Sequence, residues 1–449
     1  MLTLHPAERP LSGTIRIPGD KSISHRSIIL GAIAKGDTEV TGFLESADSR
    51  ATISAFEKMG VRIEGSLDKH ARPHLRVHGK GLYGLSQPSS AIDALNSGTT
   101  ARLLAGLLSA QAFTSSITGD ESLRRRPMKR VITPLTQMGA QIETLARPDC
   151  LPMRIHGARL TGIDYTSPQA SAQVKSALLL AGLYADTPTV IREPFLSRNH
   201  SEIMLRSFGA DVTGDIEAID AYDTPDVFAG AVITLRPGTQ LKAQEVYVPG
   251  DISSAAFFIA AALLLEGSEI LLKNVGVNPS RAGFLKVLSR MGADIEAVEV
   301  YEESAEPCAD LLVRHAPLSI PGDMLIVGGE DIPTLIDELP MLAILSAFVE
   351  GTCVIKDAQE LKVKESDRIR IVVDNLRAMG ADVTETEDGM IIRGGAPLHG
   401  AQIKTHGDHR IAMGFAIASL AVSGETIIDD AECINVSYPG FFRDLSKIA

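Results

Sequence analysis

The sequence L-S-R-M-G-A-D-I, at residues 288–295, is one copy of a pattern that recurs along the chain. In each copy an amphipathic stretch ends in Met-Gly or Phe-Gly, and a segment of alternating apolar residues follows. A glycine directly after a helix permits the left-handed conformation that ends many helices, and a period of two is typical of a strand. The other copies begin at residues 56, 135, 205 and 376. The pattern predicts a repeated helix–glycine–strand unit.

A second, more apolar helix pattern alternates with the first, as in the segments 27–42, 256–272 and 416–428. Together the two patterns divide the chain into six units of about 75 residues, each with two helices and several strands. An eight-fold barrel would need units of about 30 residues with one helix each. A solenoid would have shorter and more uniform repeats. Six units therefore predict an α/β protein with two pseudo-symmetric domains of three units each.

The tripeptide Pro-Gly-Asp marks the expected domain boundary, because it precedes an apolar helix at residues 18–20 and again at 249–251. Pro-Gly is a strong turn signal. We expect the N-terminal segment to complete the C-terminal half of the chain. The predicted domains are residues 21–248 and residues 1–20 plus 249–449, with a hinge at the two crossings near residues 20 and 249.

Composition excludes several classes of function. The 449 residues include 43 Lys and Arg against 56 Asp and Glu, a net charge of −13 that disfavours nucleic acid and anionic membranes as partners. The longest apolar run, at 255–265, is too short to span a bilayer. No secretion signal is recognisable at the N-terminus, and the four cysteines are far apart in the sequence. We expect a cytoplasmic protein with reduced thiols.

The strongest local motif is P-G-D-K-S-I-S-H-R-S at 18–27. Ser22 is predicted to cap the helix that follows, with Lys21 just before the helix and Arg26 one turn further along the same face. The N–H groups and the dipole of a helix N-terminus attract anions, so this arrangement suits a phosphate or carboxylate group. A capped helix with solvated charges explains the motif equally well.

Three more helix starts carry polar or cationic side chains, in the segments 96–100, 171–175 and 406–410. Gly98, in the first of them, permits a ligand to approach the backbone closely. If the four helix N-termini converge on one cleft, they form a strongly anion-attracting site. The three arginines at 124–126 are either a solvated run or the source of one bidentate phosphate ligand.

Carboxylates accompany cations in K-V-K-E-S-D-R at 362–368, and I-D-E-L-P at 336–340 places two carboxylates before an apolar helix. Asp337 or Glu365 is a candidate for proton transfer while the cations hold an anionic substrate. The alternatives are an exposed charged loop and simple stabilisation of a helix N-terminus.

Other motif-like patterns predict no function. G-K-G-L-Y-G at 79–84 matches a dinucleotide-binding fingerprint by letter, but no helix pattern follows it. Three histidines between residues 70 and 78 lie in a strand pattern after a proline, which disfavours a common helical face for metal ligation. The pair at 406 and 409 has no apparent third ligand. We expect no metal.

Seven ordered motifs make the sequence resemble the EPSP synthase family. They are P-G-D-K-S-I-S-H-R-S, N-S-G-T-T-A-R-L, R-R-P-M, S-A-Q-V-K-S-A-L-L-L-A-G, I-D-E-L-P, K-V-K-E-S-D-R and D-H-R-I-A-M, and the resemblance runs from about residue 11 to the C-terminus. It implies a 3-phosphoshikimate 1-carboxyvinyltransferase of the shikimate pathway, which leads to chorismate and the aromatic amino acids. Such an enzyme transfers the enolpyruvyl group of phosphoenolpyruvate to the 5-hydroxyl of shikimate 3-phosphate by addition and elimination of phosphate.

The fold of this family has two inverse α/β domains, each of three β-α-β-α-β-β repeats, which close around the substrates. The resemblance also implies a monomer without cofactor, whose partners are the two small-molecule substrates, and a target of the inhibitor glyphosate.

The resemblance further assigns roles to individual residues. Asp337 would accept the proton of the 5-hydroxyl, with Lys364 beside it, and Glu365 would protonate the methylene carbon of phosphoenolpyruvate; Lys21 completes the catalytic set. Shikimate 3-phosphate would contact Lys21, Ser22, Arg26, Ser171, Ala172, Gln173, Arg198, Asp337 and Lys364. Phosphoenolpyruvate would contact Lys21, Gly98, Arg126, Gln173, Arg368 and Arg410.

Two positions depart from the common form of the family. Ser171-Ala172-Gln173 resembles the divergent second class, where the common class has Ser-Ser-Gln, and Val436 stands where the common class has a lysine that contacts phosphoenolpyruvate. A related transferase that acts on UDP-N-acetylglucosamine shares the fold, but no cysteine here lies in its catalytic-loop context. A non-catalytic anion-binding repeat protein would not need Asp337 and Glu365 beside the cations.

Overall fold

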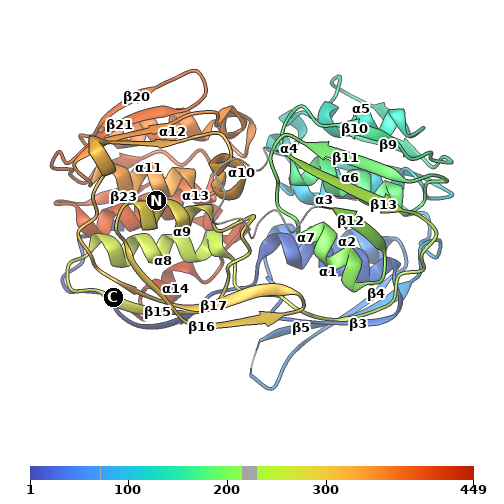
Figure 1. Ribbon diagram of the computed structural model, residues 1–449, viewed down its shortest axis with the longest axis horizontal. Coiled ribbons are helices and arrows are strands. Elements are labelled where there is room, and N and C mark those ends of the chain that lie inside the picture. Colours follow the sequence, from blue (N-terminus) through green and yellow to red (C-terminus); the bar gives the residue numbers. More distant parts are fainter. Residues whose placement is uncertain (71, 215–229) are drawn as a thin grey trace. The chain divides into compact units, whose positions relative to one another are not determined.

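Six small sheets, each with its helices, make up the described residues (1–70, 72–214 and 230–449) of the computed structural model shown in Figure 1. The chain divides into two units. Unit 1 contains residues 1–18, 249–302 and 307–449, and unit 2 contains residues 19–248 and 303–306.

Unit 2 holds three four-stranded sheets. Their strand orders are β14-β3-β5-β4 (Glu245–Tyr247, Lys35–Thr41, Pro73–Lys80, Arg62–Leu67), β6-β7-β9-β8 (Ile92–Asp93, Thr114–Thr118, Met153–His156, Gln141–Thr144) and β10-β11-β13-β12 (Asp164–Thr166, Thr189–Glu193, Ala231–Arg236, Asp211–Gly214). In each sheet the first pair is parallel and the other two pairs are antiparallel. The helices are α1 (Lys21–Ile33), α2 (Ala47–Lys58), α3 (Gly98–Leu108), α4 (Glu121–Arg125), α5 (Lys129–Gln137), α6 (Ala172–Gly182) and α7 (His200–Ser207).

Unit 1 repeats this plan. Its sheets are β2-β15-β17-β16 (Ser12–Arg16, Glu269–Gly276, Glu306–Arg314, Asp294–Glu303), β18-β19-β21-β20 (Met324–Val327, Gly351–Ile355, Met390–Gly394, Asp382–Glu385) and β22-β23-β1 (Gln402–Ile403, Thr426–Ile428, Leu2–Leu4). The helices are α8 (Ile252–Leu264), α9 (Gly283–Arg290), α10 (Asp331–Leu335), α11 (Leu339–Ala347), α12 (Arg368–Ala378), α13 (His409–Ala418) and α14 (Phe441–Leu445). Short 3₁₀ turns lie at Pro321–Asp323, Gln359–Val363, Ser419–Ala421 and Glu432–Val436.

The repeated helix–glycine–strand pattern is confirmed. The five glycines have left-handed φ values between 82° and 100°, which glycine adopts without steric cost; they are Gly60, Gly139, Gly209, Gly292 and Gly380. The strand after each glycine is the outermost strand of its four-stranded sheet. The sixth sheet has three strands, and β1 takes the place that the third strand has in the others, antiparallel to the middle strand β23.

The strands β2 and β14 each belong to a sheet of one unit, whereas the helix that follows each of them in the sequence belongs to the other unit. The strand β2 is followed by α1 of unit 2, yet it pairs in parallel with β15 of unit 1, beside which Figure 1 shows it in blue. The strand β14 is followed by α8 of unit 1, yet it pairs in parallel with β3 of unit 2. Each Pro-Gly-Asp turn at 18–20 and 249–251 therefore leads from a sheet of one unit to a helix of the other. A third Pro-Gly-Asp, at 321–323, precedes β18 within unit 1, so the tripeptide alone does not mark a boundary.

The helix α1 is capped by Asp20, so the prediction that Ser22 caps it is wrong. The Asp20 carboxylate accepts the N–H of Ile23 at 2.8 Å, and Lys21 is the first residue of the helix rather than the residue before it. Asp251 has the same place before α8 and accepts the N–H of Ser253 at 2.9 Å. A capping carboxylate also suits the positive end of the helix dipole.

Each unit has its own hydrophobic core. The helices α1, α3 and α6 are buried along nearly their whole length in unit 2, and so are α8, α11 and α13 in unit 1. A helix that is apolar on all sides belongs in a protein interior. The apolar run at 255–265 lies, except for its last residue, in α8, whose residues are buried from Ile252 to Leu263.

Candidate active site

Lys21 begins α1 and lies beside α2. Its ammonium nitrogen is 3.2 Å from a carboxylate oxygen of Asp48, and its side chain is 17% exposed. The first turn of α1 therefore presents a cation that is fixed in position but still open to a ligand. Asp48 has no counterpart among the predicted site residues, because nothing in its local sequence indicates that α2 packs beside Lys21.

Arg26 is buried and joins three helices. Its Nε donates to the Ser201 hydroxyl and its Nη2 to the Ser176 hydroxyl, both at 2.7 Å, while Nη1 donates to the Ser22 carbonyl at 2.9 Å. Burial lowers the pKa of Arg26 to about 10, against the opposing effect of the Glu202 carboxylate. Among the described residues, these bonds use three of the five N–H groups of the guanidinium, which leaves two for a ligand.

The start of α3 is tightly surrounded. Ser97 caps the helix by accepting the N–H of Thr100 at 3.1 Å. A methyl group added to Gly98 would overlap Nη1 of Arg102 and lie 3.6 Å from Nη1 of Arg126. Two guanidinium groups therefore converge on the helix N-terminus at Gly98, an arrangement that favours an anion.

Of the three arginines at 124–126, the third turns inward. Arg126 is 7% exposed and donates to the side-chain oxygen of Asn96, whereas Arg125 is exposed and pairs with Glu121. Arg102, which the sequence analysis did not assign to the site, donates to the Gln173 side chain at 3.0 Å. Its position four residues after Gly98, one helical turn, is a signal that could have found it.

Gln173 connects α6 to α3, because its amide nitrogen also donates to the Thr99 hydroxyl at 3.2 Å. Ser171 precedes α6 and donates its backbone N–H to Glu193 at 3.0 Å. Ala172 and Gln173 are half-buried in the first turn of α6, and Arg198 is half-buried in the loop before α7. Unit 2 thus assembles the predicted residues of α1, α3 and α6 around a group of cations.

Lys175 lies at the predicted cationic start of α6 but does not add a cation to the candidate site. Its side chain is 0% exposed and lies 2.8 Å from each of the carboxylates of Glu193 and Glu202. Burial alone would lower the pKa of Lys175, but these two carboxylates outweigh burial and raise it. Lys175 therefore fixes the loop around Ser197, whose carbonyl it also bonds, and does not face a ligand.

The predicted residues of unit 1 gather around Arg368, the first residue of α12. Its guanidinium contacts Asp408 at 2.8 Å, Glu365 at 2.6 Å and Asp337 at 3.3 Å, and the side chain is 1% exposed. Burial opposes the charged form, yet the carboxylates of Asp408, Glu365 and Asp337 outweigh it and raise the pKa of Arg368. Arg368 is thus a permanent cation that holds both carboxylates predicted to transfer protons.

Asp337 has two further cations within reach. Lys364 is 3.8 Å from its carboxylate and also pairs with Glu360 at 3.2 Å. Arg410, in the first turn of α13, is 3.8 Å from the Asp337 carboxylate and donates to its carbonyl oxygen at 3.3 Å. The side chain of Asp337 is 12% exposed, so it remains open to a substrate.

Of the rejected motifs, His409 stands between Asp408 and Arg410 at the start of α13, whereas the segment 79–84 lies outside both groups. The segment 79–84 ends β5 and starts no helix, as expected. No cluster of three or more metal-ligating side chains occurs in the part of the chain that the structure describes.

Val436 ends the 3₁₀ turn at Glu432–Val436 and is half-buried. Among the described residues, no helix is both long and apolar enough to cross a membrane.

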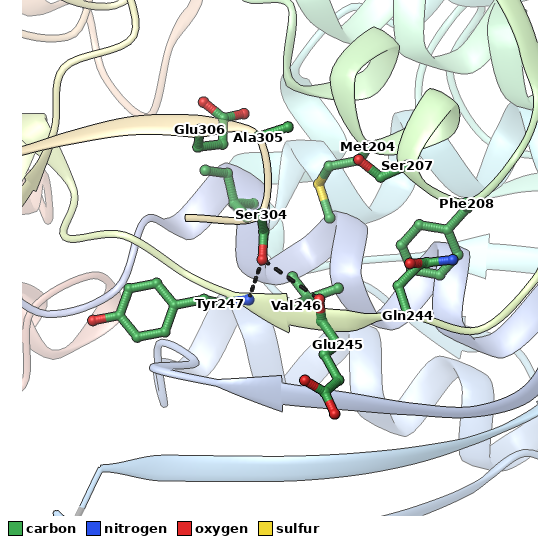
Figure 2. A pocket seen from close by; sticks show the side chains of 11 residues that line it. Met204, Ser207, Phe208, Gln244, Glu245, Val246, Tyr247, Ser304, Ala305 and Glu306 are labelled. Carbon is green, nitrogen blue, oxygen red and sulfur yellow. Dashed lines mark hydrogen bonds between the residues drawn. The ribbon is translucent and has the colours of Figure 1, made fainter. Parts of the chain in front are cut away.

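Figure 2 shows a pocket elsewhere in unit 2, between α7, β14 and the segment 304–306. The Ser304 hydroxyl accepts the N–H of Tyr247 at 2.8 Å and donates to the Glu245 carbonyl at 3.5 Å. Among the described residues that line this pocket, the charged ones are the carboxylates of Glu245 and Glu306. The pocket therefore does not suit anionic substrates.

The sequence matches the EPSP synthase (3-phosphoshikimate 1-carboxyvinyltransferase) family over residues 6–445. The chain belongs to the EPSP synthase family. It is 50% identical to the 3-phosphoshikimate 1-carboxyvinyltransferase of Geobacter sulfurreducens and 48% identical to that of Brevibacillus brevis, covering 100% of this chain and 99% and 100% of theirs. The solved EPSP synthase of Acinetobacter baumannii has a TM-score of 0.83 at 43% identity and matches 100% of this chain and 98% of that chain.

The α/β fold of inverse repeats and the enzyme class expected from the sequence are confirmed: the chain is an enolpyruvyl transferase of the shikimate pathway. Membership of the EPSP synthase family does not by itself assign roles to individual residues, which remain predictions.

Replacing Lys175 with Met is expected to lower the free energy of unfolding by about 3–5 kcal/mol, because it leaves two buried carboxylates without their cation. The matched control is Lys129→Met, since Lys129 is 72% exposed and 4.0 Å from Asp149. That exposed pair is expected to contribute little. Urea denaturation measures both variants. A loss for Lys175→Met no larger than that of the control would contradict the structural role of Lys175.

Proposed function

We propose that this enzyme transfers the enolpyruvyl group of phosphoenolpyruvate to the 5-hydroxyl of shikimate 3-phosphate, through the residues assembled in the two groups described above. The main support for this reaction is the similarity of the whole chain to 3-phosphoshikimate 1-carboxyvinyltransferases. The cations around α1, α3 and α6 support the substrate class, because each substrate brings a phosphate and a carboxylate.

In the proposed reaction, Glu365 protonates the methylene carbon of phosphoenolpyruvate and C2 becomes electrophilic. The 5-hydroxyl oxygen bonds to C2 while Asp337 accepts its proton. Glu365, now a carboxylate, takes back a proton from the new methyl group of the tetrahedral adduct; the C–H electron pair forms the carbon–carbon double bond, and the bond from C2 to the phosphate oxygen breaks to release phosphate. The contacts of Arg368 with both carboxylates support this division of roles, because one fixed cation holds the acid and the base in defined positions.

Substrate binding is proposed for the remaining predicted residues. Shikimate 3-phosphate is held by Lys21, Ser22, Arg26, Ser171, Ala172, Gln173, Arg198, Asp337 and Lys364, and phosphoenolpyruvate by Lys21, Gly98, Arg126, Gln173, Arg368 and Arg410. The exposure of Lys21 supports the first set, and so do the two N–H groups of Arg26 that make no hydrogen bond among the described residues. The guanidinium groups of Arg102 and Arg126 beside Gly98 support the second.

Three further features are proposed from the resemblance. Ala172 in Ser171-Ala172-Gln173 supports membership of the divergent second class, and Val436 supplies no charge where the common class has a lysine. The enzyme is a monomer, and it acts in the cytoplasm.

Lys21→Ala, Asp337→Ala and Glu365→Gln are each expected to lower turnover by about 10²–10⁴-fold, because each removes a charge or a proton-transfer group from the reacting centre. Phosphate release is measured with phosphoenolpyruvate and either shikimate 3-phosphate or UDP-N-acetylglucosamine. Glu143→Gln, on an exposed ion pair with Arg154, is the control that should retain activity. Release with the nucleotide sugar alone, or with neither acceptor, would overturn the proposed reaction. Near-normal turnover of Lys21→Ala, or of both carboxylate variants, would overturn the proposed roles.

Substrate is expected to close two hinged domains, 21–248 and 1–20 plus 249–449, about the crossings near residues 20 and 249. Ligand groups from both halves support this proposal. Small-angle scattering should show a smaller radius of gyration at saturating shikimate 3-phosphate than without it. Shikimate, which lacks the phosphate, is the control ligand and should have little effect at the same concentration. An unchanged radius with shikimate 3-phosphate contradicts the closure.

Glyphosate is expected to inhibit the enzyme, and Gly98→Ala to weaken that inhibition by roughly 5- to 150-fold. The added methyl group overlaps the guanidinium of Arg102, and overpacking of this kind costs about 1–3 kcal/mol. Inhibition is measured against phosphoenolpyruvate. Gly65→Ala, on the exposed part of β4, is the control, because the nearest atom to an added methyl group there is Cδ2 of Leu75, at an ordinary contact distance of 3.4 Å. Equal inhibition constants for the wild type and Gly98→Ala would show that the position does not shape the inhibitor site.

A further inference from the structure

Two neighbouring contacts join α1 to α2. Lys21 contacts Asp48, and four residues further along both helices the His25 ring nitrogen Nδ1 is 2.7 Å from the Thr52 hydroxyl. The substrate-binding set proposed above includes no residue of α2. The helix is therefore placed to support the site rather than to form it.

The second contact continues to α3. The hydroxyl oxygens of Thr52 and Thr100 are 2.7 Å apart, and the Thr100 hydroxyl donates to the hydroxyl of Ser97 at 2.8 Å. Ser97 is the residue that caps α3 immediately before Gly98. All four side chains, from His25 to Ser97, are between 0% and 1% exposed. A buried hydrogen-bond chain thus runs from α1 through α2 to the start of α3.

The direction of every bond in this chain follows from its last link. Thr100 uses its single hydroxyl proton on Ser97, so Thr52 must donate to Thr100. Thr52 then has no proton left for His25, so His25 donates from Nδ1. Burial, together with the charges of Lys21 and Arg26, lowers the pKa of His25 to about 3, so the ring is neutral near pH 7. Its proton is therefore on Nδ1.

We propose that Thr52 is a positioning residue for phosphoenolpyruvate: through this chain it fixes the N-terminus of α3, and so Gly98, relative to Lys21. This inference rests on the proposed function for the identity of the substrate. It adds α2 to the parts of the protein that determine affinity.

The other contacts at the two ends explain why one substrate is affected more than the other. Without Thr52, α1 keeps the hydrogen bond from the Leu44 N–H to the Ser24 hydroxyl at 3.0 Å, and neither residue is proposed to bind substrate. The start of α3 keeps contacts to Gln173 and Arg126, but both of these residues are proposed to bind substrate and must adjust to it. Thr52 supplies a contact to α3 that does not compete with the ligand.

The test compares Thr52→Val with Thr52→Ser. The valine variant keeps the shape but removes the hydroxyl, and we expect the KM for phosphoenolpyruvate to rise about tenfold, equivalent to about 1.4 kcal/mol. The KM for shikimate 3-phosphate should stay close to that of the wild type. The serine variant keeps the hydroxyl and should restore the KM for phosphoenolpyruvate. A merely structural role of Thr52 would not separate the two KM values.

Thr38→Val is the matched control. Thr38 is also 0% exposed in unit 2, on β3, and its hydroxyl has no hydrogen-bond partner among the described residues. Both KM values should be unchanged in this variant. Thr100→Val breaks the same chain at its next link, and it should give the same separation of KM values if Thr52→Val does not fold.

An unchanged KM for phosphoenolpyruvate in the valine variants, an equal rise of both KM values, or no restoration by Thr52→Ser overturns the proposal. Nitrogen-15 NMR of the wild type tests the chain even if the enzyme uses another substrate. His25 should be neutral at pH 7 with its proton on Nδ1. A charged ring or a proton on Nε2 overturns the chain itself, whereas failure of wild-type turnover with this signal present overturns only the proposed function.

Discussion

A helix buried on all sides must still satisfy the N–H groups of its first turn, and this requirement shapes both halves of the protein. Side chains meet it at the start of four of the buried helices, α1, α3, α8 and α13, where Asp20, Ser97, Asp251 and Asp408 each accept a backbone N–H. Polar groups are thereby concentrated where apolar helices begin. Lys21 and Gly98 directly follow such caps, and Arg410 donates its backbone N–H to one, so the candidate site uses positions that the fold already has to keep polar.

The site residues of unit 2 and those of unit 1 differ in how their cations are paired, and this difference suits two different roles in the reaction. In unit 2 the guanidinium groups of Arg102 and Arg126 are turned toward Gly98 at the start of α3. In unit 1 the central cation, Arg368, is already paired with three carboxylates. The first arrangement favours holding an anion, and the second favours keeping acids and bases in fixed geometry.

Features that depend on residues close together in the sequence could be predicted, whereas features that depend on contacts between distant segments could not. The five helix-ending glycines were predictable because a left-handed residue is a local requirement. The cap of α1 was misassigned because Asp20 and Ser22 are both good capping residues, and the preceding turn selects between them. Lys175 was misread because its carboxylate partners come from elsewhere in the chain, Glu193 being 18 residues away. The pairing of β2 with β15 depends on contacts across the sequence that no local pattern encodes.

The pairing of β1 and β2 with later strands constrains the order in which the parts of the protein can fold during translation. The strands β1 and β2 leave the ribosome before residues 19–248, but their partners β23 and β15 are made after those residues. Unit 2 receives its last strand, β14, before synthesis of unit 1 resumes, so it can complete its sheets while the nascent chain is still growing. Until their partners β23 and β15 are made, the edges of β1 and β2 remain unpaired, and unpaired strand edges are prone to aggregation. We therefore expect the N-terminal segment, rather than the larger folded parts, to be where chaperones act during translation.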